Sequence, residues 1–229
     1  MDIAFIYFDI DNTLLDHSAA ERAALADLHA HFSTAFNGVP VATLQTEYHR
    51  QSVPLWKQYA AGDIDKSTVK RERFARTFQT LGIDLDPVAS GTFYMRRYAA
   101  HWQWVEGARS AFLSAAGHYP VGIITNGFAK TQSDKLSRFP ELQRRSEAVI
   151  ISEEVGALKP QPRLFSHAAT KAGVPPGKIL YVGDSYSSDV LGATRAGWQM
   201  AWYLYNGESE KAPVALRFTR WDAFTQWLP

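Results

Sequence analysis

Two carboxylates stand one residue apart near the start of the chain. Asp9 and Asp11 follow the apolar run Ile3–Phe8 and precede Asn12 and Thr13. A continuous apolar run is typical of a buried parallel strand, and open α/β sheets bind ligands outside the carboxyl ends of their strands. Two acids that face one small volume repel each other, so the pair favours a bound cation or a proton on one acid. An acidic turn leading into a helix is the alternative interpretation of this motif.

A second acidic cluster follows another apolar run, Ile179–Val182. The string GDSYSSD places Asp184 and Asp189 directly after that run and before an amphipathic segment. Asp189 could be only an N-cap or first-turn residue of a helix over Ser187–Ala196, or it could join Asp184 in a metal site. Combined with the first acidic pair, these residues supply hard oxygen ligands, which favour Mg²⁺ over zinc.

Two further elements could bind an anion. Thr125 ends the apolar run Val121–Thr125 and Asn126 follows it, and this turn offers a hydroxyl and main-chain N–H groups. Lys159 comes just after a third run, with Pro160 restricting the local backbone. A lone Thr or Lys is usually an ordinary surface residue. Here every element follows a strand of one predicted sheet, so we expect them to form a single site.

The elements that must position this site form an alternating pattern. Amphipathic segments at Arg163–Ala172 and Ser187–Ala196 separate the later apolar runs, which predicts right-handed crossovers and a doubly wound α/β sheet. The predicted strands are Ile3–Phe8, Val121–Thr125, Ala148–Ile151, Ile179–Val182 and Gln199–Tyr203. The C-terminal strings at 217–221 and 224–227 suggest a closing strand or a short helix.

The interval between the first two strands is far longer than one crossover needs. It exceeds 100 residues, whereas a whole βαβ unit takes about 30. The excess contains helical patterns at Glu47–Tyr59, Lys66–Leu81 and Ala89–Trp102. We therefore predict a catalytic core at 1–15 and 105–229 and an inserted helical domain at 16–104. Its many aromatic residues are expected mainly to form that domain's own interior.

This ordered set of motifs resembles the haloacid dehalogenase superfamily, whose signatures are DxDx[TV], a Ser or Thr, a Lys and an acidic pair. The resemblance covers the whole chain and implies a Rossmann-like core with an all-helical cap between the first two motifs. It implies that Asp9 is the nucleophile and Asp11 the general acid and base. By the same resemblance, the phosphate-binding residues are Thr125, Asn126 and Lys159, and the Mg²⁺ ligands are Asp9, Asp11 (through its carbonyl) and Asp184, with Asp189 binding the metal directly or supporting it.

The resemblance also implies a reaction. Asp11 disfavours dehalogenation, since dehalogenases of the family lack this second Asp, and it favours phosphomonoester hydrolysis through an aspartyl-phosphate. The strings IITNGF (123–128) and IISEEVG (150–156) look like the pyrimidine 5′-nucleotidase branch, and the N-acylneuraminate-9-phosphatase branch shares much of them. We expect nucleoside 5′-monophosphates as substrates. The alternatives are a sugar-phosphate or N-acylneuraminate-9-phosphate phosphatase, a β-phosphoglucomutase-like phosphotransferase, and a non-catalytic binding protein of this fold.

Composition narrows the partners and the compartment. The 229 residues carry 24 Lys plus Arg against 23 Asp plus Glu, which argues against a nucleic-acid polymer or an anionic membrane as partner. The absence of Cys excludes disulfides, thiolate catalysis and Cys-ligated zinc. Neither a signal peptide nor a run of membrane-spanning length is predicted. We expect a soluble cytoplasmic monomer or homodimer that acts on a small-molecule phosphate ester.

Overall fold

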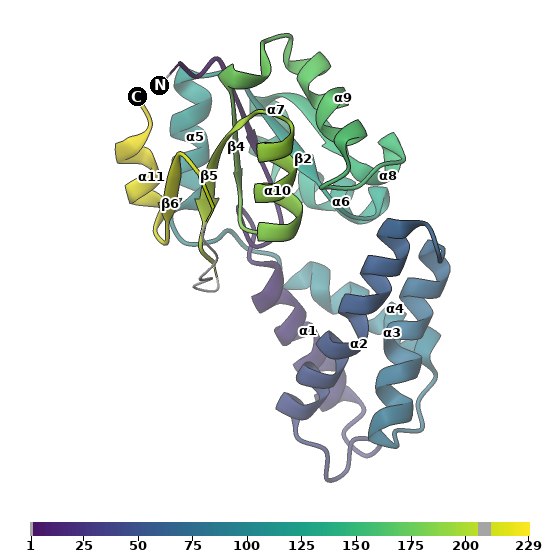
Figure 1. The fold of residues 1–229 in the computed structure, drawn as a ribbon. Coiled ribbons are helices and arrows are strands. Elements are labelled where there is room, and N and C mark those ends of the chain that lie inside the picture. Colours follow the sequence, from purple (N-terminus) through teal and green to yellow (C-terminus); the bar gives the residue numbers. More distant parts are fainter. Residues whose placement is uncertain (1, 206–211) are drawn as a thin grey trace. The chain divides into compact units, whose positions relative to one another are not determined.

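The chain divides into two compact units in the computed structural model (Figure 1). One unit is Met1–Asp16 with Gln103–Pro229, and the other is His17–Trp102. The structure describes residues 2–205 and 212–229, so position 1 and positions 206–211 of the predicted core lie outside the described residues. Among the helices of these described ranges, none has both the length and the apolar character needed to cross a membrane.

The first unit is built on a six-stranded parallel sheet, which confirms the predicted α/β class. The strand order is β3-β2-β1-β4-β5-β6. The chain moves outward from β1 in one direction and then returns to continue from β4 in the other, so the topological switch point lies between β1 and β4. The strands are β1 (Phe5–Phe8), β2 (Val121–Thr125), β3 (Ser146–Ile151), β4 (Ile179–Gly183), β5 (Gln199–Tyr203) and β6 (Leu216–Phe218).

The strand predictions differ from the structure mainly at strand ends. β2 and β5 have the predicted bounds. β1 begins at Phe5 rather than Ile3 because its pairing with β4 starts only at Ile179, the first residue of that strand. β3 begins at Ser146, two residues earlier than predicted, because Ser146 pairs with Val121 ahead of a register shift. At β1 the apolar run is longer than the pairing, whereas β3 includes the polar residues Ser146 and Glu147, which carry no apolar signal.

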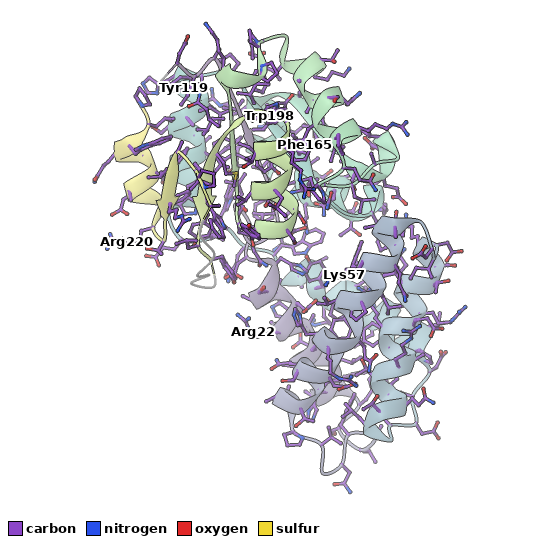
Figure 2. All side chains as sticks on the ribbon, in the orientation of Figure 1. Arg22, Lys57, Tyr119, Phe165, Trp198 and Arg220 are labelled. Atoms are coloured by element: carbon purple, nitrogen blue, oxygen red, sulfur yellow. The ribbon has the colours of Figure 1, made fainter. Side chains whose placement is uncertain are left out.

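Helices cover both faces of the sheet, as the continuous apolar strands require. Successive residues of β1 point to opposite faces: Tyr7 stacks on Trp198 with ring centroids 5.5 Å apart, and Phe8 meets Phe112 edge-on at 5.4 Å. Phe165 and Trp198, labelled in Figure 2, pack together on the Tyr7 side. The helices of this unit are α5 (Ala108–His118), α6 (Ala129–Arg138), α7 (Pro140–Arg145), α8 (Ser152–Val155), α9 (Pro162–Ala172), the 3₁₀ turn η1 (Pro176–Lys178), the π-helical turn η2 (Tyr186–Val190), α10 (Leu191–Arg195) and α11 (Trp221–Trp227).

The continuous helix predicted over Ser187–Ala196 is wrong in its first half. The chain forms the π-helical turn η2 over Tyr186–Val190 and becomes α-helical only from Leu191. The main-chain N–H of Val190 donates to the carbonyl of Ser185, five residues back, at 3.1 Å. The carboxylate of Asp189 accepts from the main-chain N–H of Ser185, so the wide turn closes around a buried acid. Such π-turns frequently occur at functional sites.

The second unit consists of helices α1 (His17–His31), α2 (Val41–Ala61), α3 (Lys66–Leu81) and α4 (Pro87–Ala100). α3 has its predicted bounds because Asp65 caps its first turn by accepting from the N–H of Thr68, and Gly82 ends it with φ 67°. α2 is longer than predicted and runs through Pro54. The interior is aromatic: Tyr48 contacts Phe74 and Tyr94 at ring-centroid distances of 5.1 and 5.4 Å.

Candidate active site

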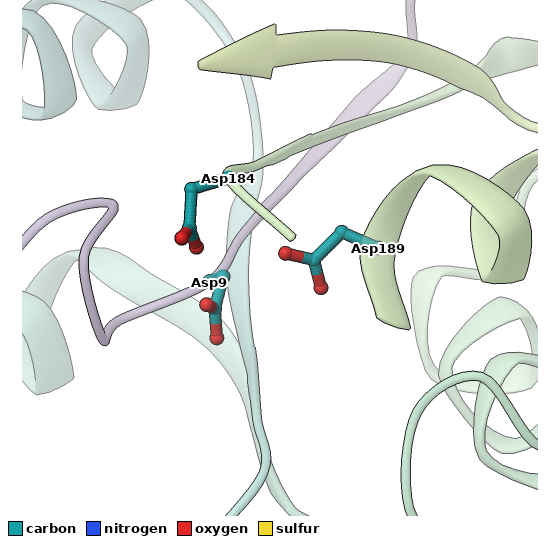
Figure 3. Close-up of side chains that lie close together, drawn as sticks. All are labelled: Asp9, Asp184 and Asp189. Carbon is teal, nitrogen blue, oxygen red and sulfur yellow. The ribbon is translucent and has the colours of Figure 1, made fainter. Parts of the chain in front are cut away.

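The two predicted acidic motifs lie side by side at the switch point. Asp9 directly follows β1 and Asp184 directly follows β4, and all four residues of β1 pair with β4. The N–H of Asp9 donates to the carbonyl of Val182 at 2.9 Å, which extends the pairing to the motif itself. Asp189 completes the group: one carboxylate oxygen from each acid lies within 4.8 Å of the others (Figure 3).

Lys159 lies between two of these acids. Its ammonium is 2.7 Å from Asp9 Oδ1 and 2.8 Å from Asp189 Oδ1, and the side chain is almost fully buried. The Nζ also donates to the hydroxyl of Tyr181 at 3.0 Å, and that hydroxyl lies 3.2 Å from Asp189 Oδ1. Lys159 is therefore held from several sides, with its charge directed at the predicted nucleophile.

The electrostatics of the site show an excess of negative charge. Burial raises the pKa of Asp9 to about 7, with Lys159 opposing this effect and Asp189 adding to it. Burial, together with Asp189 and Asp9, also holds the pKa of Asp184 well above its usual range. Burial alone would lower the pKa of Lys159, but the two carboxylates outweigh it and raise that pKa. The site holds three carboxylates but only one ammonium, so negative charge is in excess. The carboxylates offer oxygen atoms, and this donor set fits a hard divalent cation.

Asp189 differs from the other two acids because protein groups already contact both of its oxygens. Oδ1 faces the Lys159 ammonium and the Tyr181 hydroxyl, and Oδ2 accepts from the Ser185 N–H at 3.0 Å. Gly183 makes this packing possible, since a Cβ at that position would lie 2.6 Å from Asp189 Cγ. These contacts are better suited to a residue that orients Lys159 than to a residue that binds a metal ion directly.

We expect Gly183→Ala to damage the site. The added methyl must displace the buried Asp189 carboxylate, so overpacking should cost about 1–3 kcal/mol in the free energy of unfolding and should also lower activity. Gly177→Ala is the matched control, because a Cβ there meets open space. Thermal unfolding and hydrolysis rates of the two variants check this. Gly183→Ala protein that behaves like Gly177→Ala protein would contradict the account of Asp189.

The turn of Thr125 and Asn126 is hydrogen-bonded directly to the segment that carries Lys159. Thr125 is fully buried at the end of β2. The amide of Asn126 donates to the carbonyl of Lys159 at 3.1 Å and accepts from the Lys159 N–H at 2.8 Å. The Asn126 side chain thus holds the Lys159 loop in place. The phosphate-binding role expected for Thr125, Asn126 and Lys159 stays a prediction.

The carboxylate of Asp11 lies outside the acidic group of Asp9, Asp184 and Asp189. Its Oδ1 is 2.5 Å from the ammonium of Lys135, and its Oδ2 accepts from the amide of Gln132 at 3.0 Å. Both donors come from α6 and were not predicted from the sequence. The signal that could have found them is their position, because α6 begins at Ala129, two residues after Gly127, and its first turns therefore lie near the strand ends.

Fold and site together define an α/β enzyme core with a polar, acidic centre at its switch point. The chain belongs to the haloacid dehalogenase-like hydrolase family, whose model matches residues 3–197. This result confirms the resemblance inferred from the four motifs.

Named relatives span nearly the whole chain. It is 30% identical over 216 residues to the pyrimidine 5′-nucleotidase YjjG of Escherichia coli, covering 94% of this chain and 92% of that protein. It is 31% identical over 212 residues to a glyceraldehyde 3-phosphate phosphatase of Pyrococcus furiosus, covering 91% and 83%. The magnesium-bound crystal structure of the putative hydrolase YfnB from Bacillus subtilis superposes with a TM-score of 0.83 at 23% identity, covering 99% of this chain and 98% of that one.

Proposed function

We propose that this chain is a Mg²⁺-dependent phosphomonoester hydrolase that acts through an aspartyl-phosphate on Asp9. The observation that carries the proposal is the buried ammonium of Lys159, shared between Asp9 and Asp189 beside Asp184. The relatives named as phosphatases and nucleotidases support the same reaction class.

The chain's own residues account for the covalent steps. A phosphate monoester is close to dianionic at neutral pH, so Lys159 lessens the repulsion between substrate and the Asp9 carboxylate. An Asp9 oxygen attacks phosphorus, the bond from phosphorus to the leaving oxygen breaks, and Asp11 donates a proton to that oxygen. Asp11 then takes a proton from the water that attacks the phosphorus of the acyl phosphate. Phosphate leaves and the Asp9 carboxylate is restored.

The Mg²⁺ site would use Asp9, Asp184 and the main-chain carbonyl of Asp11. Asp189 would support it by orienting Lys159, because both of its oxygens already have protein partners. When bound, Mg²⁺ supplies positive charge that stabilises the phosphoryl oxygens and the attacking carboxylate. The negative excess among these three acids, with Asp9 and Asp189 buried and Asp184 half-buried, is the structural observation in favour of this cation.

For the substrate we propose nucleoside 5′-monophosphates, with pyrimidine bases preferred. The nucleotidase-like strings at 123–128 and 150–156 and the relative YjjG support this choice. A small sugar-phosphate phosphatase is the second candidate, since the glyceraldehyde 3-phosphate phosphatase is equally similar over nearly the same length. The helical unit contains none of the four motifs. We therefore propose that it influences substrate choice rather than the chemical steps.

A phosphate-release screen with Mg²⁺ tests the function. The panel contains UMP, dUMP, dTMP, glyceraldehyde 3-phosphate and N-acylneuraminate 9-phosphate. We expect the highest kcat/KM for a pyrimidine nucleotide, and a higher value for either sugar phosphate would favour the second candidate. Conversion of β-glucose 1-phosphate to glucose 6-phosphate without phosphate release would instead identify a phosphotransferase. Failure to act on any phosphate ester would contradict the proposed reaction class.

A further inference from the structure

Two buried polar side chains outside the four motifs contact Asp11. Lys135 and Gln132 lie on α6 with 1% and 3% of their surfaces exposed. The Lys135 ammonium is 2.5 Å from Asp11 Oδ1, and the Gln132 amide donates to Asp11 Oδ2 at 3.0 Å. Since they are three positions apart, the two residues occupy the same side of the helix. Each holds a different oxygen of one carboxylate.

Burial of the Lys135 ammonium and the Gln132 amide costs free energy, which hydrophobic packing alone does not offset. An ammonium removed from water loses several kcal/mol of hydration unless an anion compensates for it, and Asp11 supplies that anion. Gln132 donates to Asp11 although its own Oε1 is buried without a hydrogen-bond partner among the described residues. An unsatisfied carbonyl of this kind typically costs about 1–3 kcal/mol. The amide Nε2 also donates to the Asn126 carbonyl at the longer distance of 3.4 Å. The orientation of the amide therefore satisfies Asp11 and Asn126 and leaves its own carbonyl without a partner.

The start of α6 is itself anchored to the rest of the site. The Gly127 N–H donates to the hydroxyl of Ser152 at 3.1 Å, and the Ala129 N–H donates to Glu153 Oε2 at 2.6 Å. Ser152 and Glu153 are the first two residues of α8 and precede Lys159 by seven and six positions. The two donors to Asp11 thus stand on a helix end fixed to neighbouring parts of the core.

We propose that Lys135, assisted by Gln132, is a positioning residue that fixes the plane of the Asp11 carboxylate for proton transfer with the leaving oxygen. This inference rests on the proposed function. With both oxygens held by donors from one helix, the carboxylate cannot rotate about its Cβ–Cγ bond without breaking a contact. Loss of Lys135 should therefore slow the step in which a proton is transferred, and it should leave other steps largely unchanged.

Leaving-group dependence separates this role from a purely structural one. A nucleoside leaves as an alkoxide that needs a proton, whereas 2,4-dinitrophenolate leaves without one. For Lys135→Met we expect kcat/KM to fall about 10- to 100-fold more for UMP than for 2,4-dinitrophenyl phosphate, within the usual range of general acid catalysis. Lys135→Arg should keep the ratio near the wild-type value because it retains a cationic donor. Lys130→Met is the matched control, since Lys130 lies on the same helix with its side chain 80% exposed.

A double-mutant cycle identifies Asp11 as the residue through which Lys135 acts. Asp11→Asn should show the same preference for the good leaving group, and Lys135→Met should cost little more in that background. The inference would be overturned if Lys135→Met lost kcat/KM equally on both esters or hydrolysed UMP faster than the wild type. It would also be overturned if the losses of the two substitutions were additive in the double variant. If Lys135→Met does not fold, as judged by thermal unfolding, Gln132→Leu tests the contact to the other oxygen by the same ratio.

Kinetics of the Asp11→Asn and Lys135→Met variants distinguish a failure of the proposed function from a failure of the role of Lys135. An Asp11→Asn variant without leaving-group preference would contradict the general-acid role in the proposed function, and the inference about Lys135 would fall with it. If Asp11→Asn prefers the good leaving group and Lys135→Met does not, only the inference about Lys135 is overturned.

Discussion

Asp9→Asn should abolish phosphate release, lowering kcat at least about a thousandfold, as expected for removal of a covalent nucleophile. The amide has nearly the shape of the carboxylate but is a far weaker nucleophile. Among the described residues, the two neighbouring acids are poor substitutes, because Asp184 accepts a hydrogen bond from the Thr13 hydroxyl and both oxygens of Asp189 already have protein partners. Steady-state kinetics with a nucleotide and with an aryl phosphate measure the effect.

The fold should survive this substitution. Asp9 shares a buried space with two other acids, and Lys159 keeps its contact with Asp189 after the change. Relief of the repulsion should leave the free energy of unfolding of the metal-free variant equal to or above that of the wild type. Asp134→Asn is the matched control, because Asp134 is an exposed residue of α6 paired with Lys130. An Asp9→Asn enzyme that retains more than a few per cent of activity contradicts the assignment of the nucleophile.

Removal of divalent metal should have the second largest effect. After exhaustive chelation with EDTA we expect activity to fall by about a hundredfold or more, since a bound metal typically contributes several kcal/mol to stabilisation of the transition state. Mg²⁺ or Mn²⁺ should restore it, because both prefer oxygen ligands. Unchanged activity in the chelated protein would contradict the metal requirement.

A binding measurement supports the activity assay. Mg²⁺ should raise the Tm of the wild-type protein, with a stabilisation of about 2.7 kcal/mol at a concentration 100 times Kd. Asp184→Asn removes one proposed ligand and should largely abolish this rise, whereas Asp134→Asn should keep it. An equal rise in the Asp184→Asn protein would show that the metal binds elsewhere.

The sheet and the site motifs could be predicted because their signals are local. Continuous apolar runs identify β1 to β5, and a chemical residue directly after a run lies at the carboxyl end of its strand. Parallel pairing then brings Asp9 and Asp184 together although 175 positions separate them. No bounds were predicted for helix α1 because it is rich in alanine: Ala20 and Ala24 are among its buried residues and leave little apolar contrast.

Other parts of the site depend on contacts that no local pattern contains. Lys135 and Gln132 meet Asp11 across more than 100 positions, and as polar residues of a short helix they look like a solvent-exposed face. The choice left open for Asp189, a helix cap or part of a metal site, depends on the π-turn that directs it inward to Lys159. The tie between Asn126 and the Lys159 main chain likewise emerges only once both loops stand at one sheet edge.

The central claim is that a phosphoryl group is transferred to Asp9. Acid quenching of the enzyme during turnover with UMP, reduction with borohydride, and peptide mass spectrometry test it most directly. Borohydride reduces an aspartyl-phosphate to homoserine, so the account predicts homoserine at position 9 only when substrate and Mg²⁺ are both present. No such conversion should occur in the Asp9→Asn protein. Conversion at a different acid, or unmodified Asp9 in an enzyme that turns over under the same conditions, would contradict it.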